Sequence, residues 1–318
     1  MLLLCLLIAS TVGLLLYLRI APFLGLVDHP TDRGLHAEPT VVGAGVVSVS
    51  LLAAVLALGP PAYGARIAAL FLMLLTAIGL IDDRWGLASS LRLLCYLAVG
   101  LLTPWLIFSE SPLSGVALLV VGVGVAWCIN LFNFMDGADG LATAQLLCVS
   151  TGLGLMAHFG LSDHPGWIEW CAWAAMCCLP LMWLNWPPAR LFMGDAGAIP
   201  LGFFLAVLGL LAFDQSRLLG WAWAVLMMPF FLDTGITLLT RLALGKAPHV
   251  AHRDHAYQRL TLRMGSPLPV TLGLLVMQVV WQYPLAILII YDQFPLPLLV
   301  ILSTIPTISA VVYARVRA

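Results

Sequence analysis

Residues 115–131 read GVALLVVGVGVAWCINL, a run without a charged side chain, and much of the chain has the same character. Of its 318 residues, 62% are hydrophobic and 9% are charged. An ordinary soluble domain is about 25% charged, so this chain has too few charges to cover a surface in water. The apolar runs are also continuous, without the alternation of outer-membrane barrel strands. The sequence therefore predicts an all-α polytopic membrane protein and excludes a soluble enzyme.

Eleven apolar runs are candidates for crossing a bilayer, for which a helix needs about 20 residues. Their expected bounds are residues 2–20, 41–58, 66–81, 91–108, 115–131, 139–159, 168–184, 199–213, 219–240, 269–290 and 296–313. The connections contain no soluble linker, so residues 1–318 are expected to form a single integral membrane domain. An odd number of crossings places the two termini on opposite faces.

The cationic residues divide unevenly between the two faces. Alternate connections and the C-terminal end hold twelve of the 14 Lys and Arg residues. Because cytoplasmic loops carry the excess of Lys and Arg, we expect the N-terminus outside and the C-terminus in the cytoplasm. The predicted location is the inner (plasma) membrane. At least nine of the 15 acidic residues fall on the cytoplasmic face, so we expect the active site on its loops. A net charge of −1 predicts no nucleic-acid partner.

Two adjacent acids, Asp82 and Asp83, end the third run in the segment GLIDDRWGL. Adjacent carboxylates repel, so such a pair at a membrane boundary needs a cation or a shifted pKa. We expect the pair to bind a divalent metal ion or to transfer a proton. The alternative is that water solvates both acids and that Arg84 neutralises one of them.

After the fifth run the chain reads NLFNFMDGADGL, in which Asn130, Asn133 and Asp136 are spaced three apart. On a continuing helical turn these side chains share one face, where they can hold a hydrated cation or a polar substrate. Asp139 has a second interpretation, as the N-cap of the sixth run.

After the seventh run the chain reads NWPPARLFMGDAG, from Asn185 to Gly197. Arg190 suits a phosphate, and Asp195 suits Mg²⁺, which binds one or two carboxylates together with substrate phosphates. The alternative is a glycine-rich helix start with an aspartate cap.

The last long connection, residues 241–268, is rich in histidine and arginine. Its candidate site residues are His252, Arg253, His255, Tyr257 and Gln258. The two histidines would share a helical face, which can indicate zinc, but no third ligand or HExxH pattern accompanies them. The interleaved arginines favour an anion-binding loop, and binding of lipid headgroups is a third, overlapping interpretation.

Together these loops favour Mg²⁺-dependent phosphoryl transfer, in which a metal ion neutralises phosphate charge. A membrane-embedded site implies that one substrate is a lipid. The rival interpretation is an ion- or proton-coupled transporter, for which Asp233, an acid within the ninth run, is the main support. The crowding of polar groups on one face argues against a transporter. Asp233 has other interpretations, as a partner of Arg241 or as a conformational element.

Four segments, DDRWGL, NFMDGADGLA, RLFMGDAG and HRDHAYQRL, resemble in order those of the polyprenyl-phosphate N-acetylhexosamine-1-phosphate transferases, of the glycosyltransferase family 4 type. This family includes the phospho-MurNAc-pentapeptide translocase and the GlcNAc-1-phosphate transferases. The last segment is most similar to the O-antigen-initiating branch. The resemblance implies that polyprenyl (undecaprenyl) phosphate attacks a UDP-N-acetylamino sugar of the GlcNAc, FucNAc or QuiNAc type. UMP leaves and a polyprenyl-diphosphate sugar forms, as the first membrane step of O-antigen or other cell-surface polysaccharide synthesis.

The resemblance also implies roles for residues, with Asp195 as a ligand of Mg²⁺ (or Mn²⁺) and Asp82 as a second metal contact. The catalytic candidates are Asp82, Asp83, Asp136, His252 and His255. The substrate-binding candidates are His36, Asn130, Asn133, Asn185, Arg190, Arg253, Tyr257 and Gln258. The expected partners are the UDP-sugar, undecaprenyl phosphate, the lipid bilayer and a second copy of the chain.

One segment departs from the family pattern. The lysine that often precedes a Pro-Thr pair is absent before Pro39 and Thr40, where Glu38 stands instead. Arg33 and His36 are the candidates for the cation that serves there.

Overall fold

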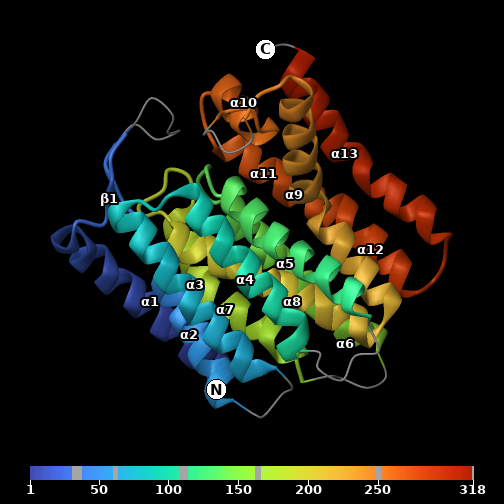
Figure 1. The fold of residues 1–318 in the computed structure, drawn as a ribbon, viewed down its shortest axis with the longest axis horizontal. Helices are drawn as coiled ribbons and strands as arrows, with labels where there is room; N and C mark the ends of the chain where they lie inside the picture. The colour runs from blue at the N-terminus through green and yellow to red at the C-terminus, as the bar shows by residue number, and fades with distance from the viewer. Residues whose placement is uncertain (31–37, 60–63, 108–113, 162–165, 248–251, 317–318) are drawn as a thin grey trace.

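The computed structural model describes residues 1–30, 38–59, 64–107, 114–161, 166–247 and 252–316, which are mostly helical. The helices form one bundle, with the N-terminus at one end and the C-terminus at the other (Figure 1). The helices are α1 Leu2–Ile20, η1 Ala21–Leu24, α2 Gly45–Leu58, α3 Ala65–Trp85, α4 Ser89–Ile107, α5 Gly115–Met135, α6 Leu141–Gly160, α7 Ile168–Asn185, α8 Asp195–Gln215, α9 Arg217–Ala243, α10 Ala256–Met264, α11 Leu268–Met277, η2 Gln278–Gln282, α12 Tyr283–Ile290 and α13 Leu296–Val316. The two strands are β1 Val27–Asp28 and β2 Thr40–Val41.

Each predicted apolar run coincides with a helix, the tenth with α11, η2 and α12 together. Within the described ranges, nine helical segments are long and apolar enough to cross a membrane. α2 is shorter, with 14 residues, and α7 is not among the nine. The prediction of a polytopic helical membrane protein is therefore confirmed, whereas eleven crossings and their orientation stay predictions.

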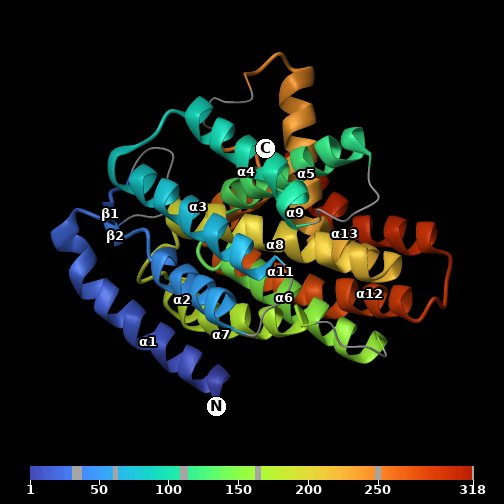
Figure 2. The same cartoon turned by 60° about the horizontal axis from the view of Figure 1, so that its bottom comes forward.

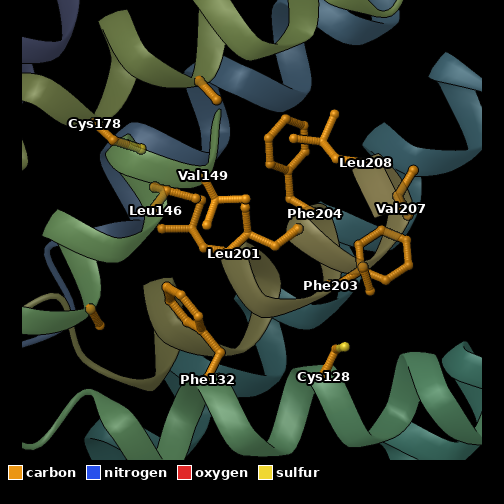
Figure 3. Packing of buried hydrophobic residues seen from close by; sticks show 14 of the residues in the cluster. Cys128, Phe132, Leu146, Val149, Cys178, Leu201, Phe203, Phe204, Val207 and Leu208 are labelled. Atoms are coloured by element: carbon orange, nitrogen blue, oxygen red, sulfur yellow. The ribbon is translucent and has the colours of Figure 1, made fainter. Parts of the chain in front are cut away.

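The centre of the bundle is α8, with α3, α5 and α9 packed against it (Figure 2). Phe203 and Phe204 of α8 are fully buried and lie in the same cluster as Phe132 of α5 (Figure 3). The two helices approach closely, since a Cβ on Gly202 would lie 2.8 Å from the Cβ of Phe132. A helix that is apolar on all sides lies either in a protein core or in lipid, and α8 lies mostly in the core of the bundle. This burial holds α8 in place and so positions Asp195, its first residue.

The outside of the bundle is apolar as well. Large side chains such as Leu70, Val116 and Leu239 are 65%, 72% and 67% exposed. Exposed apolar surface on this scale is unfavourable in water but suits contact with lipid tails. The surface thus agrees with the composition in indicating a protein of the bilayer.

The helix of the second apolar run, α2, begins at Gly45 and not at residue 41 as predicted, because Thr40 and Val41 form the extended strand β2. Val41 pairs with β1 in an antiparallel ladder and forms a parallel bridge with Leu191. The N–H of Gly45 then donates to the carbonyl of Met193 at 2.9 Å. A Cβ on Gly45 would lie 2.2 Å from the Cα of Gly197, so α2 and α8 meet at their starts. The extended segment ties the loop before α8 to the connection after α1.

Candidate functional site

A cavity of about 520 Å³ opens at the end of the bundle that carries β1 and α10 (Figure 1). Its walls come from the β1–β2 region, the ends of α3 and α5, the start of α4, the loop before α8, and α10. Eight predicted site residues line it: Asp82, Asp83, Asn133, Asp136, Asn185, Asp195, Tyr257 and Gln258. The structure thus brings residues from four separate predicted loops to one place.

Five other predicted residues are described but do not line this cavity: Asn130, Arg190, His252, Arg253 and His255. Asn130 lies within α5, three positions before Asn133, and Arg190 is exposed on the loop before α8. The substrate-binding role of Asn130, Arg190 and Arg253 and the catalytic role of His252 and His255 stay predictions. His36 lies outside the described residues.

Asp83 holds the start of α8. Its Oδ1 accepts the N–H of Asp195 at 2.9 Å, and its Oδ2 accepts the N–H of Ala196 at 3.0 Å. Gly194 has φ +69°, and a Cβ there would lie 2.6 Å from Oδ2 of Asp83, so this close approach requires a glycine. A carboxylate is stabilised at a helix N-terminus, where free N–H groups carry partial positive charge. The helix start is therefore capped by Asp83 of α3, and the side chain of Asp195 is left to face the cavity.

Asp82 faces the other way and meets a cation. It accepts a hydrogen bond from the N–H of Leu87, and its Oδ2 lies 2.5 Å from Nη1 of Arg92. The same Nη1 lies 2.7 Å from Oδ2 of Asp195. Arg84, the neutralising partner in the alternative interpretation, lies over the Trp85 ring at 5.7 Å from its centroid. Arg92 therefore joins the acids of α3 and α8 in the cavity wall.

Asp136 follows α5 as its C-cap and turns into the cavity. Burial raises the pKa of this carboxyl well above its usual value, and the nearby charges of Asp195, Asp83 and Asp139 raise it further. Within the described part of the chain its carboxylate has no recorded hydrogen bond or ion pair. It is thus the cavity acid most in need of a proton or a bound cation.

Asn185 serves the fold at this site. Its Nδ2 donates to the carbonyl of Leu191 at 3.0 Å, and its Oδ1 accepts the N–H of Gly140 at 3.0 Å. The side chain is only 3% exposed, so it joins the turn after α5 to the loop before α8. Asp139 adds a second tie, because its Oδ2 accepts the N–H of Ala189 at 3.0 Å. The alternative that Asp139 caps α6 is wrong, since the N-cap residue is Gly140.

Asp233 holds the start of α10 as Asp83 holds the start of α8. Its Oδ1 accepts the N–H of Ala256 at 2.8 Å, and its Oδ2 accepts the N–H of Tyr257 at 3.0 Å. The hydroxyl of Tyr257 donates to the carbonyl of Phe134 at 2.8 Å, which fixes α10 against the end of α5. Arg241, the partner suggested for Asp233, forms an ion pair with Asp254.

The two histidines lie beside this helix start. Their rings are stacked with centroids 5.1 Å apart, and Nδ1 of His255 lies 3.4 Å from Oδ1 of Asp233. Burial lowers the pKa of His252 to about 4, with further lowering by His255 and Arg241, so it is neutral at pH 7. Among the described residues, no three His, Cys, Asp or Glu side chains form a group that could hold a metal ion. This weakens the zinc interpretation of the histidine pair.

Cations surround Asp254 in the same connection. It forms ion pairs with Arg241, with Arg259 at 3.0 Å and with Lys246 at 3.8 Å. Burial opposes ionisation, yet hydrogen bonds from Arg241 and Arg259 hold the pKa of Asp254 below its usual value. Three cations on one acid leave an excess of positive charge, as the anion-binding interpretation of this loop requires.

Residues 65–213 match glycosyl transferase family 4. This range runs from α3 to α8 and includes five acids that line the cavity: Asp82, Asp83, Asp136, Asp139 and Asp195. The match covers 149 of the 318 residues, so just under half of the chain is similar to this family. The α10 side of the cavity lies outside the matched range of family 4.

Curated relatives bear names of the same kind. The chain is 29% identical over 283 residues to the "Decaprenyl-phosphate N-acetylglucosaminephosphotransferase" of Mycolicibacterium smegmatis, covering 74% of this chain and 68% of the relative. It is 27% identical over 263 residues to the "Probable undecaprenyl-phosphate N-acetylglucosaminyl 1-phosphate transferase" of Bacillus subtilis, covering 76% and 71%. It is 30% identical over 204 residues to the "Phospho-N-acetylmuramoyl-pentapeptide-transferase" of Acaryochloris marina, covering 57% and 52%.

Arg92 is a residue of this site that the sequence motifs did not indicate. It stands nine positions after Asp83, where the next helix begins. A cation at the start of the helix that follows an acidic pair is a signal that could have found it. Asp28, which belongs to none of the four sequence motifs, also lines the cavity.

Proposed function

We propose that the chain transfers a sugar 1-phosphate from a UDP-N-acetylamino sugar to polyprenyl phosphate. The acceptor oxygen forms a bond to the β-phosphorus, and the bond from that phosphorus to the bridging oxygen breaks. UMP leaves with the electron pair, and the product is a polyprenyl-diphosphate sugar. Atoms and charges balance without an oxidant or a further reactant.

The observation that carries the proposal is an acid-lined cavity at one end of an apolar helix bundle. Asp82, Asp136 and Asp195 come from three separate segments that lie within the range matched to family 4. The relatives' names supply a lipid phosphate as acceptor and an amino-sugar phosphate as the transferred group. An apolar bundle suits the lipid, and the polar cavity suits a nucleotide diphosphate.

The donor set fits a hard divalent cation such as Mg²⁺ or Mn²⁺. Asp82 and Asp195 each direct an Oδ2 atom to one point, where Nη1 of Arg92 lies 2.5 and 2.7 Å from them. Mg²⁺ commonly uses only one or two carboxylates and completes its shell with water and substrate phosphates, so a third protein acid is not required. When bound, the ion would neutralise the donor's diphosphate and stabilise charge on the leaving UMP.

The protein's own groups prepare the rest of the site. Asp83 and Asp233 already occupy the N–H groups at the starts of α8 and α10, so these helix ends are not free to bind phosphate. The lipid phosphate has a second pKa of about 6 and is largely a dianion at neutral pH. It can therefore attack directly, without a covalent aspartyl intermediate.

The transporter alternative has lost its main support. It rested on Asp233 as an acid within the membrane, and the structure gives this carboxylate two backbone N–H donors and His255. A carboxylate used in this way stabilises a helix start and needs no transported ion to explain it.

The test is UMP release by the purified chain from a panel of UDP-sugars, with and without undecaprenyl phosphate. We expect release only with the lipid, and strong loss of it in Asp195→Asn. The matched control is Asp214→Asn, which removes the same charge from the opposite end of the same helix and should retain activity. Lipid-independent release, or full activity of Asp195→Asn, would contradict the proposal.

The panel also tests which UDP-sugar is the donor. We propose a GlcNAc, FucNAc or QuiNAc donor, a role in starting O-antigen or related polysaccharides, and a site on the cytoplasmic face of the inner membrane. The unequal distribution of Lys and Arg supports this orientation. A homodimer remains a prediction that the mass of the purified protein in nanodiscs would test.

A further inference from the structure

One guanidinium nitrogen serves two carboxylates in the cavity wall. Nη1 of Arg92 lies 2.5 Å from Oδ2 of Asp82 and 2.7 Å from Oδ2 of Asp195. The two acids belong to α3 and α8 and stand 113 positions apart in the chain, whereas Arg92 belongs to the first turn of α4. Its side chain is 26% exposed, so it is held by the acids and still reaches the cavity.

Arg92 is also the sole cationic residue among those that line the described cavity. Six aspartates line the same walls: Asp28, Asp82, Asp83, Asp136, Asp139 and Asp195. An anionic phosphate entering such a space is repelled unless a cation accompanies it or a cationic side chain turns towards it. The walls therefore give Arg92 two competing sets of partners, the acids and a bound phosphate.

The two acids that hold Arg92 are the ones assigned above to the divalent cation. An arginine nitrogen and a divalent cation cannot share the space between the same two oxygen atoms, because like charges at that separation repel strongly. Arginine has a long flexible stem and a planar fork of donors that matches a phosphate. Displacement from the acids would leave this fork beside the space where substrate phosphate binds.

We propose that Arg92 is a positioning residue that exchanges Asp82 and Asp195 for substrate phosphate when a divalent cation binds. This inference rests on the proposed function and adds to it a coupling between metal and nucleotide. Because such coupling is reciprocal, the cation strengthens phosphate binding and phosphate strengthens cation binding. The exchange also keeps the two acids paired with a positive charge at each stage.

The experiment measures binding, separately from turnover, on the full chain in nanodiscs. Mn²⁺ alone is titrated by electron paramagnetic resonance, and UMP is titrated by calorimetry at saturating Mn²⁺. We expect Arg92→Ala to bind Mn²⁺ about tenfold tighter and UMP about tenfold weaker than wild type. The control is Arg84→Ala, which removes an arginine beside the same acidic pair but outside the cavity, and which should match wild type.

The outcomes of these titrations separate a failure of the exchange from a failure of the metal assignment. If Arg92→Ala binds Mn²⁺ no tighter than wild type, or binds UMP equally well, the exchange is overturned. If Asp195→Asn binds Mn²⁺ as tightly as wild type does, the metal assignment of the proposed function fails, and the exchange fails with it. Arg92→Gln, which removes the charge and retains a polar side chain, provides the same test if Arg92→Ala does not fold.

Discussion

Two helix starts in this protein are held in the same way but in different surroundings. Asp83 of α3 binds two consecutive N–H groups of α8, and Asp233 of α9 binds two consecutive N–H groups of α10. The first lies in a wall of aspartates with Arg92, whereas the second lies beside a histidine pair and a loop rich in cations. The same local device therefore supports two unlike surroundings, an acidic cavity wall that we propose binds a metal and a cation-rich connection whose anion binding stays a prediction.

The two carboxylates differ in how far the position of their helix depends on them. α8 is the buried centre of the bundle and carries Asp195, so an error in its start moves a proposed metal ligand directly. α10 has nine residues and a second attachment through the hydroxyl of Tyr257. Loss of the Asp83 contact should therefore have the larger effect on chemistry.

The largest effect is expected for Asp83→Asn. A carboxamide has one acceptor oxygen in place of two, so one N–H of α8 is left without a partner, which destabilises by about 1–3 kcal/mol. A displacement of Asp195 by about 1 Å is enough to lower turnover by about a hundredfold. UMP release and thermal unfolding in detergent measure the two effects. Wild-type turnover in this variant would show that the start of α8 does not position Asp195.

A smaller effect is expected for Asp233→Asn, the matched change at the other helix start. α10 loses one N–H contact with residue 233 but keeps the contact of Tyr257 with Phe134. We expect KM for the UDP-sugar to rise about tenfold, with kcat changed less. A displaced α10 would weaken binding of the ground state and of the transition state to the same extent. Hydrogen exchange across residues 256–264 should increase. A loss of kcat as large as in Asp83→Asn would remove the distinction between the two starts.

Asp136, in the acidic wall of the cavity, should make the stability of the protein depend on pH. Its pKa is raised in the folded state, so the folded protein binds this proton more tightly than the unfolded chain does. The contribution of Asp136 to stability is therefore highest at low pH, and it falls as pH rises from about 3.9 through the raised pKa. Asp136→Asn cannot titrate, so its Tm should exceed that of wild type at pH 8, with a gap that closes towards pH 4. A constant gap across this range would contradict the raised pKa.

The smallest effect is expected at His252, on the histidine side. Its folded-state pKa of about 4 lies below the ordinary value near 6.5, so the unfolded chain takes up this proton first as pH falls. The stability contribution is therefore present above about 6.5 and is lost as pH decreases towards 4. His252→Gln should lose less Tm than wild type between pH 7 and pH 5. Equal losses in the two proteins would indicate an ordinary histidine.

The order of the apolar runs was enough to predict that the acidic loops would meet. Asp82, Asp136 and Asp195 each follow a run that ends on the predicted cytoplasmic face, and all three line one cavity. The role of Asp83 as a helix cap and the internal use of Asn185 were not predictable in this way. Both depend on the direction of a side chain relative to a helix far away in sequence.

The sequence by itself determined the solvent, the helical class and the face on which polar residues gather. These properties follow from counts and spacings, because burying many charges in lipid is unfavourable at any arrangement of the helices. Only the tertiary structure decided that Arg92 joins Asp82 to Asp195 and that Asp83 and Asp233 hold helix starts. Such contacts form at distances of about 3 Å between helices, and those distances depend on how closely small residues let the helices pack.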